Sequence, residues 1–304
     1  MGQESLVTII VLTYKNFSGL KNTLDAILGQ SYSNIEIIIS DDGSENYSEE
    51  VFIPFQEKAK KTGMKIILNH NRENVGTVKN INGALSFAHG EIIGFLGCGD
   101  YYASNDIIKM VLEDFQSTEA DIVTCKMKGI SVSNPKRVST LPKRSIRKLL
   151  RGNDRIKLRY KMFNENCFCA PATFYRAEIY DIYGKYDERM RLIEDYPFMF
   201  KMVKNNVKIS FLDIFAVNYL FDGVSTGGIN PTLISDLEKI QEYILLPNIN
   251  LCKGKNKRLF LYNYKRKHCK SFGNKLLISL KYFDQFLFWQ FKRITGIWET
   301  LRRK

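Results

Sequence analysis

The stretch VTIIVLT, residues 7–13, is apolar and rich in β-branched residues, which is typical of a strand buried on both faces of a sheet. After it, leucines and isoleucines recur at spacings of three and four as far as Gly29, which predicts a helix. A second apolar run, IEIIIS (35–40), follows that helix. A buried strand, a helix and another buried strand in this order predict a parallel βαβ unit.

The same alternation continues along the chain. The further predicted elements are a helical stretch from about 47 to 62, the strand KIILN (65–69), a helix from about 77 to 89, the strand EIIGFL (91–96), a helix near 104–116, the strand DIVTCK (121–126), a strand in NCFCAPATFYR (166–176), a helix in RLIEDYPFMFKMV (191–203) and further strands in VKISFLDIFAVNYLF (207–221). We therefore predict an α/β fold with a mostly parallel sheet covered by helices.

Polar motifs follow each of the first four predicted strands. They are TYKN (13–16), DDGS (41–44), NRENVG (71–76) and GCGD (97–100). Because ligands of such sheets bind beyond the carboxyl ends of the strands, these motifs mark the expected binding site.

The formal charge of +13 is concentrated at one end of the chain. Residues 1–250 contain 30 Lys and Arg against 30 Asp and Glu, whereas residues 251–304 contain 15 Lys and Arg and only two acids, Asp284 and Glu299. A second basic stretch, residues 136–161, has eleven Lys and Arg and one acid. It is either a solvated surface segment or an arm that meets an anionic acceptor or membrane. The basic end indicates an anionic partner: a membrane surface, a nucleic acid or an acidic protein.

The end of the chain from about residue 231 is helical in pattern. Its apolar residues recur every three or four positions, at Leu276, Leu280, Phe283, Leu287, Phe291, Ile294 and Trp298. An apolar aromatic face beside a basic face predicts a helix lying on an anionic membrane. The alternative is a helix packed on the protein's own core or on a second subunit.

Several classes of protein are disfavoured by the composition. No run of 18 uncharged apolar residues occurs, and the N-terminus has no basic leader, so we expect the chain to remain in the cytoplasm. The six cysteines include no CxxC pair, and Cys167 and Cys169 are expected on a strand, so we predict neither zinc nor a disulfide. The aromatic residues of the basic end follow a helical stripe and not a stacking platform, which argues against a nucleic-acid partner.

Four segments together resemble the inverting family 2 glycosyltransferases, which have the GT-A fold. The segments are VTIIVLTYKN, IIISDDGS, NVGTVKNINGALSFAHGEIIGFLGCGD and IEDYPFMFKMV, which occur in the order of that family between about residues 6 and 228. The resemblance implies a GT-A domain over residues 1–230. Its nucleotide-sugar half would be about 1–100 and its acceptor half about 101–230. Residues 231–304 lie outside the resemblance and are predicted to form a basic helical extension.

The resemblance implies a nucleotide site around the first strands. Asp42, which precedes a glycine suited to a tight turn, matches the residue that accepts a hydrogen bond from uracil. An Asx turn alone is the alternative. Thr13 and Tyr14 match positions beside the nucleotide, where the tyrosine ring is expected to stack on the base. The sequence departs from the family at Leu12, where proline is usual, and at Lys15, where asparagine is expected.

The helix predicted from about residue 77 supplies two further candidates. Lys79 and Asn82 are three residues apart, so we expect them on one face of this helix, near its N-terminal end. A cation there is well placed for a phosphate or the base of a nucleotide, and similar positions in the family contact it. For Lys79 the alternative is an ordinary surface charge.

The fourth strand of the family ends in an Asp-x-Asp motif, often followed by a further Asp, that holds Mn²⁺ or Mg²⁺ against the diphosphate of the donor. Here Gly97 and Gly99 take the two motif positions and only Asp100 remains. Because Mg²⁺ is commonly bound by one or two carboxylates together with phosphates, we predict a weak metal site at Asp100 that the donor completes. Metal-free binding of the diphosphate, and binding without turnover, are the alternatives.

IEDYP (193–197) resembles the motif that supplies the catalytic base. The resemblance makes Asp195 the base that deprotonates the acceptor hydroxyl, with Glu194 beside it. A plain acid at a helix N-terminus is the alternative. The segment 218–228 is expected to fold over the diphosphate, with Ser225 or Thr226 as contacts.

These observations predict an inverting glycosyltransferase that uses a nucleotide sugar, most simply a UDP-linked hexose or N-acetylhexosamine. The acceptor is predicted to be a lipid-linked saccharide of bacterial capsule, cell-wall or lipopolysaccharide synthesis, and the protein to lie on the inner face of the cell membrane. The rival hypothesis is a catalytically silent, glycosyltransferase-like subunit that binds a membrane or a partner enzyme.

Overall fold

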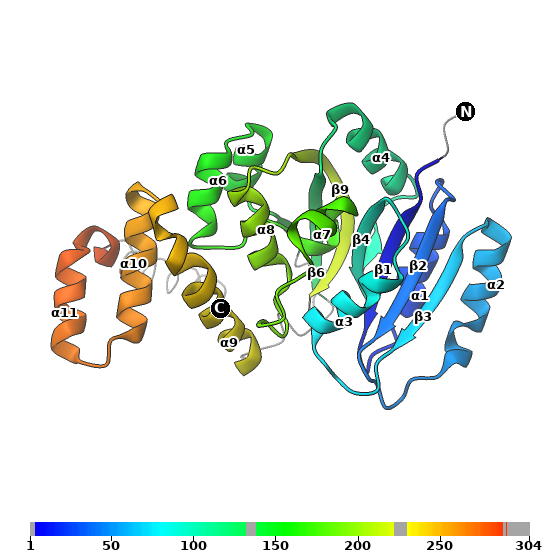
Figure 1. Cartoon of the computed structure of the whole chain (residues 1–304), viewed down its shortest axis with the longest axis horizontal. Coiled ribbons are helices and arrows are strands. Elements are labelled where there is room, and N and C mark those ends of the chain that lie inside the picture. Colours follow the sequence, from blue (N-terminus) through cyan, green and yellow to red (C-terminus); the bar gives the residue numbers. More distant parts are fainter. Residues whose placement is uncertain (1–3, 132–137, 222–229, 288–289, 291–304) are drawn as a thin grey trace. The chain divides into compact units, whose positions relative to one another are not determined.

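The structure is a computed structural model that describes residues 4–131, 138–221, 230–287 and 290 (Figure 1). The chain forms two compact units. The first comprises Met1–Arg155 and Cys167–Ile240, and the second comprises Ile156–Asn166 and Gln241–Lys304. The first unit contains all the motifs quoted above for the resemblance.

The strands of the first unit form one mixed sheet. They are β1 (Val7–Thr13), β2 (Ile35–Asp41), β3 (Lys65–His70), β4 (Ile92–Gly97), β5 (Tyr101–Tyr102), β6 (Ile122–Ser131), β7 (Val138–Leu141), β8 (Thr173–Arg176) and β9 (Ile209–Phe221). Their order is β3-β2-β1-β4-β8-β6-β9-β5, and β7 pairs with β6. Neighbours from β3 to β4 are parallel, as are β6 and β9, and the other pairs are antiparallel. The predicted α/β fold is confirmed.

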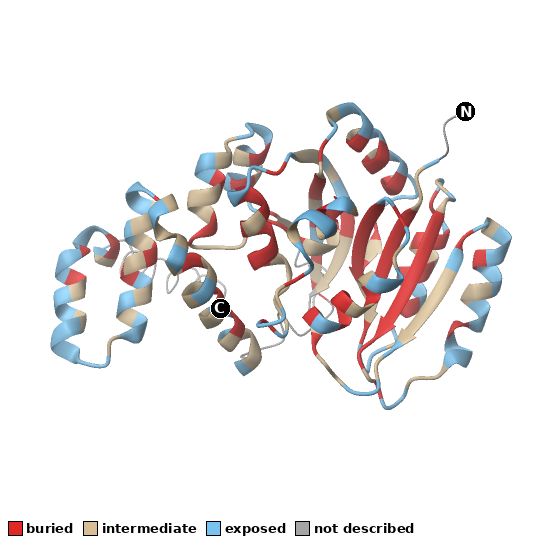
Figure 2. Ribbon diagram, viewed as in Figure 1, coloured by how far each residue is buried: buried red, intermediate tan, exposed pale blue. Residues whose placement is uncertain are grey.

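Helices cover both faces of the sheet in the first unit. They are α1 (Leu20–Leu28), α2 (Ile53–Thr62), α3 (Thr77–Ala84), α4 (Ile107–Thr118), α5 (Arg144–Arg151), α7 (Glu178–Tyr183), α8 (Asp195–Lys204) and α9 (Pro231–Lys239). Successive side chains of a strand point to opposite faces. In β1, Ile9 shares one hydrophobic core with α1, α4 and residues of β2, whereas Ile10 is buried outside that core. Helix α3 packs on β1 and β2. In Figure 2 the central strands β1 and β2 are red, whereas the edge strand β3 is tan and pale blue.

One predicted strand begins later in the structure than expected. The strand expected across 166–176 begins only at Thr173, so Cys167 and Cys169 do not lie on a strand. The reason is a short 3-10 turn, Ala170–Ala172, that contains a proline, which lacks the N–H needed for a strand ladder. All six cysteines have free thiols, in agreement with the prediction of no disulfide.

The second unit is helical in its described part. It contains α6 (Arg155–Met162) apart from its first residue, α10 (Gly254–His268) and α11 (Phe272–Lys281). Phe260 and Tyr262 of α10 are buried, and the Phe260 ring meets Phe163 edge-on at 5.7 Å. Within the described ranges no helix has both the length and the apolar character needed to cross a bilayer.

Candidate active site

The predicted site lies where the order of the parallel strands reverses direction. From β1 the chain continues to β2 and β3 on one side, and then returns to place β4 on the other side of β1. At such a switch point the loops beyond the carboxyl ends of the strands diverge and leave a crevice for a ligand. The four polar motifs follow β1, β2, β3 and β4, so the fold brings them to this edge (Figure 1).

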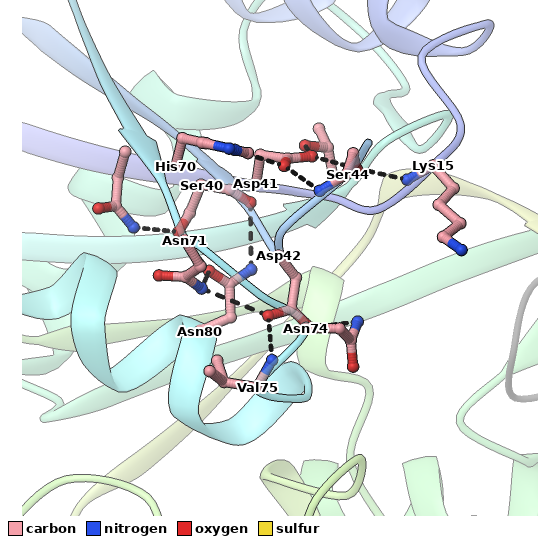
Figure 3. Close-up of polar contacts among 12 residues, drawn as sticks. Lys15, Ser40, Asp41, Asp42, Ser44, His70, Asn71, Asn74, Val75 and Asn80 are labelled. Carbon is pink, nitrogen blue, oxygen red and sulfur yellow. Dashed lines mark hydrogen bonds and ion pairs between the residues drawn. The ribbon is translucent and has the colours of Figure 1, made fainter. Parts of the chain in front are cut away.

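Asp42 organises the loop that follows β3. Its carboxylate is 5% exposed and accepts hydrogen bonds from the backbone N–H groups of Val75 at 2.9 Å and Gly76 at 3.0 Å. The side-chain amides of Asn74, at 2.8 Å, and Asn71, at 3.3 Å, donate to it as well (Figure 3). A carboxylate has about four acceptor sites, so these donors already satisfy it. To accept a hydrogen bond from uracil, Asp42 must exchange one donor, and the longest bond, from Asn71, is the easiest to lose.

Asp41 is a site residue that sequence reasoning missed. It is fully buried and accepts hydrogen bonds from the hydroxyl of Thr13 at 2.9 Å, the backbone N–H of Ser44 at 2.8 Å and the hydroxyl of Ser44 at 2.6 Å. The Nδ1 atom of His70 lies 2.9 Å from Oδ2 of Asp41, the oxygen that also accepts the Ser44 N–H (Figure 3). Asp41 therefore ties together the ends of β1, β2 and β3. The sequence signal for Asp41 was its position next to Asp42, because alternation along a strand sends the two carboxylates to opposite faces.

The turn after β1 exposes an aromatic ring at the edge of this cluster. Tyr14 is 40% exposed, whereas Thr13 is buried with its hydroxyl committed to Asp41. Only Tyr14 therefore has a free surface for a base. Lys15 adopts a φ of +58°, a conformation that asparagine tolerates better than lysine, which accounts physically for the asparagine expected there. Its backbone N–H donates to Ser44 at 2.7 Å.

The two candidates on α3 differ in their surroundings. Lys79 is exposed, whereas Asn82 is 8% exposed. The Asn82 amide donates to the carbonyl of Tyr186 at 2.9 Å and to Glu188 at 3.0 Å, and its oxygen accepts the Tyr186 N–H at 3.0 Å. The segment that precedes α8 therefore covers Asn82 but leaves Lys79 exposed. This geometry favours a structural role for Asn82 and leaves only Lys79 free to reach a nucleotide.

Asp100 lies beneath strand β9. One of its carboxylate oxygens accepts the backbone N–H of Leu220 at 3.1 Å, and the other is close to Gly97. The side chain is 6% exposed, and this burial raises the pKa of Asp100 to about 7, against the opposing effect of the hydrogen bonds from Leu220 and Gly97. Asp100 is thus a carboxylate poised to change protonation near neutral pH.

One of the two glycines before Asp100 is required by the backbone. Gly99 has a φ of +107°, which L-residues rarely adopt, and a Cβ added to the facing Gly19 would lie 2.4 Å from the Gly99 Cα. A Cβ at Gly97 would lie 3.2 Å from the end of the Asp100 side chain. The backbone therefore disfavours a carboxylate at 99, whereas a side chain at 97 would only press on the Asp100 carboxylate.

The predicted base begins helix α8. Asp195 is the first residue of this helix, is partly exposed, and follows Glu194 at the N-cap. Burial and the adjacent Asp195 charge raise the pKa of Glu194 to about 8. The pKa of the Cys169 thiol is raised by burial and then by the charge of Asp195, which places Asp195 beside the 3-10 turn that packs on β4. Asp195 therefore lies within electrostatic reach of Cys169, the residue before this turn. Ser225 and Thr226 lie outside the described residues.

A divalent cation has a limited set of ligands in the described part of the chain. No group of three or more His, Cys, Asp or Glu side chains comes together there. Asp100 supplies one carboxylate, and one of its oxygens already accepts the Leu220 N–H. This donor set fits a cation only when a ligand such as a diphosphate contributes further oxygens.

Comparisons with known proteins show the family and the fold of this chain. The family described as Glycosyl transferase family 2 matches residues 8–184. A Bacillus subtilis (strain 168) protein, the uncharacterized glycosyltransferase EpsJ, is 27% identical over 68% of this chain and 59% of its own length. The Escherichia coli UDP-Glc:alpha-D-GlcNAc-diphosphoundecaprenol beta-1,3-glucosyltransferase WfaP is 32% identical over 38% of this chain and 42% of its own. The chain thus spans less than two thirds of either relative.

A solved structure shows the same fold. The crystal structure of S. aureus TarS in complex with UDP-GlcNAc has a TM-score of 0.61 and 19% identity, and the match covers 86% of this chain and 72% of that chain. At this level of identity the similarity establishes the fold, which is that of the GT-A glycosyltransferases.

Proposed function

The chain belongs to glycosyl transferase family 2, and on that basis we propose that it is an inverting transferase that moves a hexose or N-acetylhexosamine from a UDP-sugar to a hydroxyl of a lipid-linked saccharide. The observation that carries the proposal is the occurrence in one unit of a partly exposed Tyr14 ring at the strand switch point and of Asp195 at the start of α8. The relative WfaP, whose name gives a UDP-sugar donor and a diphosphoundecaprenol-linked acceptor, supports the proposed donor and the proposed lipid-linked acceptor.

The proposed reaction is a single displacement. Asp195 takes the proton of the acceptor hydroxyl while that oxygen forms a bond to the anomeric carbon, and the bond from this carbon to the UDP oxygen breaks. Attack opposite to the leaving UDP inverts the configuration. Burial, and then the charge of Asp195, raise the pKa of Glu194 to about 8, which favours its protonated form at neutral pH. Asp195 is then available as the base.

The donor site is proposed to use three residues of the first unit. The exposed Tyr14 ring stacks on the uracil base, and Asp42 accepts the base N–H in exchange for Asn71. Lys79 is exposed on α3 and is the first Lys or Arg after the loop at 71–76 that binds Asp42. It is proposed to contact the nucleotide. A diphosphate carries negative charge that increases as the sugar leaves, so a cation here favours the transition state.

Asp100 is proposed to hold Mn²⁺ or Mg²⁺ once the donor diphosphate is bound. When bound, such an ion would neutralise charge on the leaving diphosphate. The protein itself contributes the Asp100 carboxylate, and the Leu220 N–H orients it. The backbone of Gly97 and Gly99 leaves room for a ligand to approach closely.

Titration of UDP by calorimetry tests the donor and metal assignments together. We expect UDP to bind the protein, and Mn²⁺ to strengthen that binding about tenfold, because one well-placed carboxylate–metal contact contributes on the order of 1.4 kcal/mol. Asp100→Asn preserves the shape of the side chain and should remove the effect of Mn²⁺ while leaving metal-free UDP binding unchanged. Equal binding with and without Mn²⁺ would refute the metal proposal, and absence of UDP binding would refute the donor assignment.

The glycines at 97 and 99 also support the rival function, a silent subunit that binds donor without turning it over. The two hypotheses differ in one measurement. A transferase releases UDP from a UDP-sugar, slowly with water and faster with a saccharide acceptor, whereas a silent subunit binds UDP and releases none from the sugar. The retained Glu194–Asp195 pair favours the transferase.

The second unit is proposed to bind an anionic membrane through the outer face of α11. Phe272, Leu276, Leu280, Phe283 and Leu287 are each more than half exposed. Spacings of four place Phe272, Leu276 and Leu280 on one face of α11, whereas Phe283 and Leu287 follow the break in the helix at Tyr282. The same segment buries Ser279, Tyr282 and Gln285 instead. A helix of a soluble protein normally buries its apolar face, whereas the apolar stripe formed by these five residues stays exposed.

The candidates for covering this apolar stripe are a lipid surface and a second copy of the chain, and the charge of the second unit favours the lipid. Residues 251–304 contain 15 Lys and Arg against two acids, so two copies would repel each other, whereas anionic lipid would be attracted. The stripe would place the enzyme on the cytoplasmic face of the cell membrane, where a lipid-linked acceptor is accessible. Phe291, Ile294 and Trp298, which continue the sequence pattern, lie outside the described residues.

Vesicle sedimentation tests this surface. We expect the full chain to bind vesicles that contain phosphatidylglycerol, and the double variant Leu276→Ser, Leu280→Ser to bind at least about tenfold more weakly, because each leucine contributes up to about 1.5–3 kcal/mol when buried. Ile182→Ser, at an equally exposed position on α7, is the matched control and should bind normally. The surface is wrongly assigned if the double variant binds as tightly as the control.

A further inference from the structure

A buried aspartate on α9 holds the segment that leads into the catalytic pair. Asp236 is fully buried. Its carboxylate accepts the backbone N–H groups of Arg191 at 2.9 Å, Leu192 at 2.6 Å and Ile193 at 3.2 Å. Lys239, one turn further along α9, lies 3.8 Å from the same carboxylate. Three consecutive N–H groups are thus anchored on one side chain from a helix about 40 residues later in the chain.

The anchored segment is irregular and would otherwise leave these donors unsatisfied. Helix α8 begins at Asp195, so Leu192 and Ile193 precede its first turn and their N–H groups have no partner within a helix. Buried N–H groups without an acceptor are costly, and charge-assisted bonds to a carboxylate are among the strongest available. Asp236 therefore fixes the direction in which the chain enters α8. Glu194 and Asp195 are the next two residues.

The same segment contacts the loop that Asp42 organises. The guanidinium of Arg191 donates to the backbone carbonyl of Asn74 at 2.9 Å and to its side-chain oxygen at 2.5 Å. The Asn74 amide in turn donates to Asp42 (Figure 3). The carbonyl of Arg191 accepts the Val78 N–H at 3.1 Å.

A glycine makes this approach of the two loops feasible. Gly76 has a φ of +92°, and a Cβ there would lie 2.5 Å from the Cγ atom of Arg191. The distance leaves no room for a side chain. A continuous set of contacts thus runs from Asp42 through Asn74 and Arg191 to Asp236, all within the first unit.

We propose that Asp236 is a positioning residue for sugar transfer, which sets the location of the base Asp195 by holding the backbone of Leu192 and Ile193. It does not touch the substrate. Through Arg191, Asp236 also fixes the location of Asp195 relative to the loop at 71–76 that binds Asp42. The donor site and the base are therefore held at a constant position relative to each other. The inference rests on the proposed function, because it assigns a role to Asp236 only if Asp195 is the base.

The test compares two buried carboxylates that both accept backbone N–H groups. The rate measured is UDP release from the UDP-sugar that turns over fastest. Asp236→Asn should lower kcat of this reaction by about 10–100-fold, because a displacement of the Asp195 carboxylate on the order of 1 Å lowers the rate by that factor. UDP affinity and KM for the sugar should stay within about twofold. Glu36→Gln is the matched control. It is 4% exposed, accepts the His89 N–H and the Thr8 hydroxyl, and lies on β2 away from the carboxyl ends.

Rates are compared per folded molecule, from circular dichroism and UDP binding of each variant. A second variant, Asp236→Glu, keeps the charge but lengthens the side chain by one methylene, and should fold and lose kcat by about tenfold. The inference is overturned if Asp236→Asn lowers kcat no more than Glu36→Gln, if Asp236→Glu is fully active, or if Asp236→Asn loses UDP binding together with kcat. A wild-type protein that releases no UDP from any UDP-sugar overturns the proposed function itself.

Discussion

Replacement of Asp195 by asparagine will reduce sugar transfer by about 10²–10⁴-fold, the range that a general base contributes, and will leave UDP binding intact. Asparagine has nearly the same shape but cannot take a proton from the acceptor hydroxyl. The side chain is partly exposed at the N-terminus of α8, so the change should cost little stability. Rates of UDP release with an acceptor, together with UDP titration by calorimetry, measure both quantities.

Glu194→Gln is the informative companion of this variant. Because burial and the charge of Asp195 raise the pKa of Glu194 to about 8, Glu194 is protonated at pH 7, and glutamine mimics that form. We therefore expect Glu194→Gln to retain far more activity than Asp195→Asn at pH 7. The opposite order, with Glu194→Gln inactive and Asp195→Asn active, would assign the base to Glu194. Retention of full activity by both variants would remove the pair from the mechanism.

The parallel half of the sheet could be predicted from the sequence because its strands are buried on both faces. In VTIIVLT and IEIIIS almost every side chain is apolar, and the glycine at 29 ends the intervening helix as expected. The second half of the sheet is harder to read. There β8 has only four residues and is antiparallel to its neighbours, and it pairs with strands far away in the chain. Such pairings depend on tertiary contacts that no local pattern encodes.

The site shows the same contrast between local and long-range information. The positions of Tyr14, Asp42 and Asp100 at strand ends followed from the motifs, but their partners did not. That Asp42 is satisfied by the loop at 71–76 depends on a β2–β3 register that brings the two strand ends together. Asn82 was expected to contact the nucleotide, but its amide donates to the carbonyl of Tyr186. A three-residue spacing on a helix does not say which element covers that face. The role of Asp236 had no sequence signal, because its partners are backbone groups.

Stability should depend on pH in a manner controlled by Asp100. The pKa of Asp100 is about 7 in the folded chain, against an ordinary value of 3.8, so between these values the folded state keeps a proton that the unfolded state releases. The folded state thus binds more protons, and the free energy of unfolding falls as pH rises through this window, by about 4 kcal/mol in total. Urea unfolding at several pH values between 4.5 and 8 measures the slope.

Asp100→Asn should flatten this slope, because asparagine is neutral throughout and its oxygen can still accept the Leu220 N–H. Glu194, whose raised pKa gives a slope of the same sign, remains in the variant, so the difference between the two proteins isolates Asp100. An identical slope in both proteins would show that Asp100 ionises normally and is not desolvated in solution. In that case β9 does not pack closely over the Asp100 carboxylate in solution.

The raised pKa of Asp100 also predicts how binding of the proposed metal depends on pH. A cation binds the deprotonated carboxylate, so metal binding must compete with a proton whose pKa is about 7. Mn²⁺ should therefore strengthen UDP binding more at pH 8 than at pH 6, by up to about tenfold per pH unit below the pKa. Asp100→Asn should show no such dependence. Enhancement by Mn²⁺ that is independent of pH would mean that the cation is held by the diphosphate alone, and that Asp100 serves β9 and not the donor.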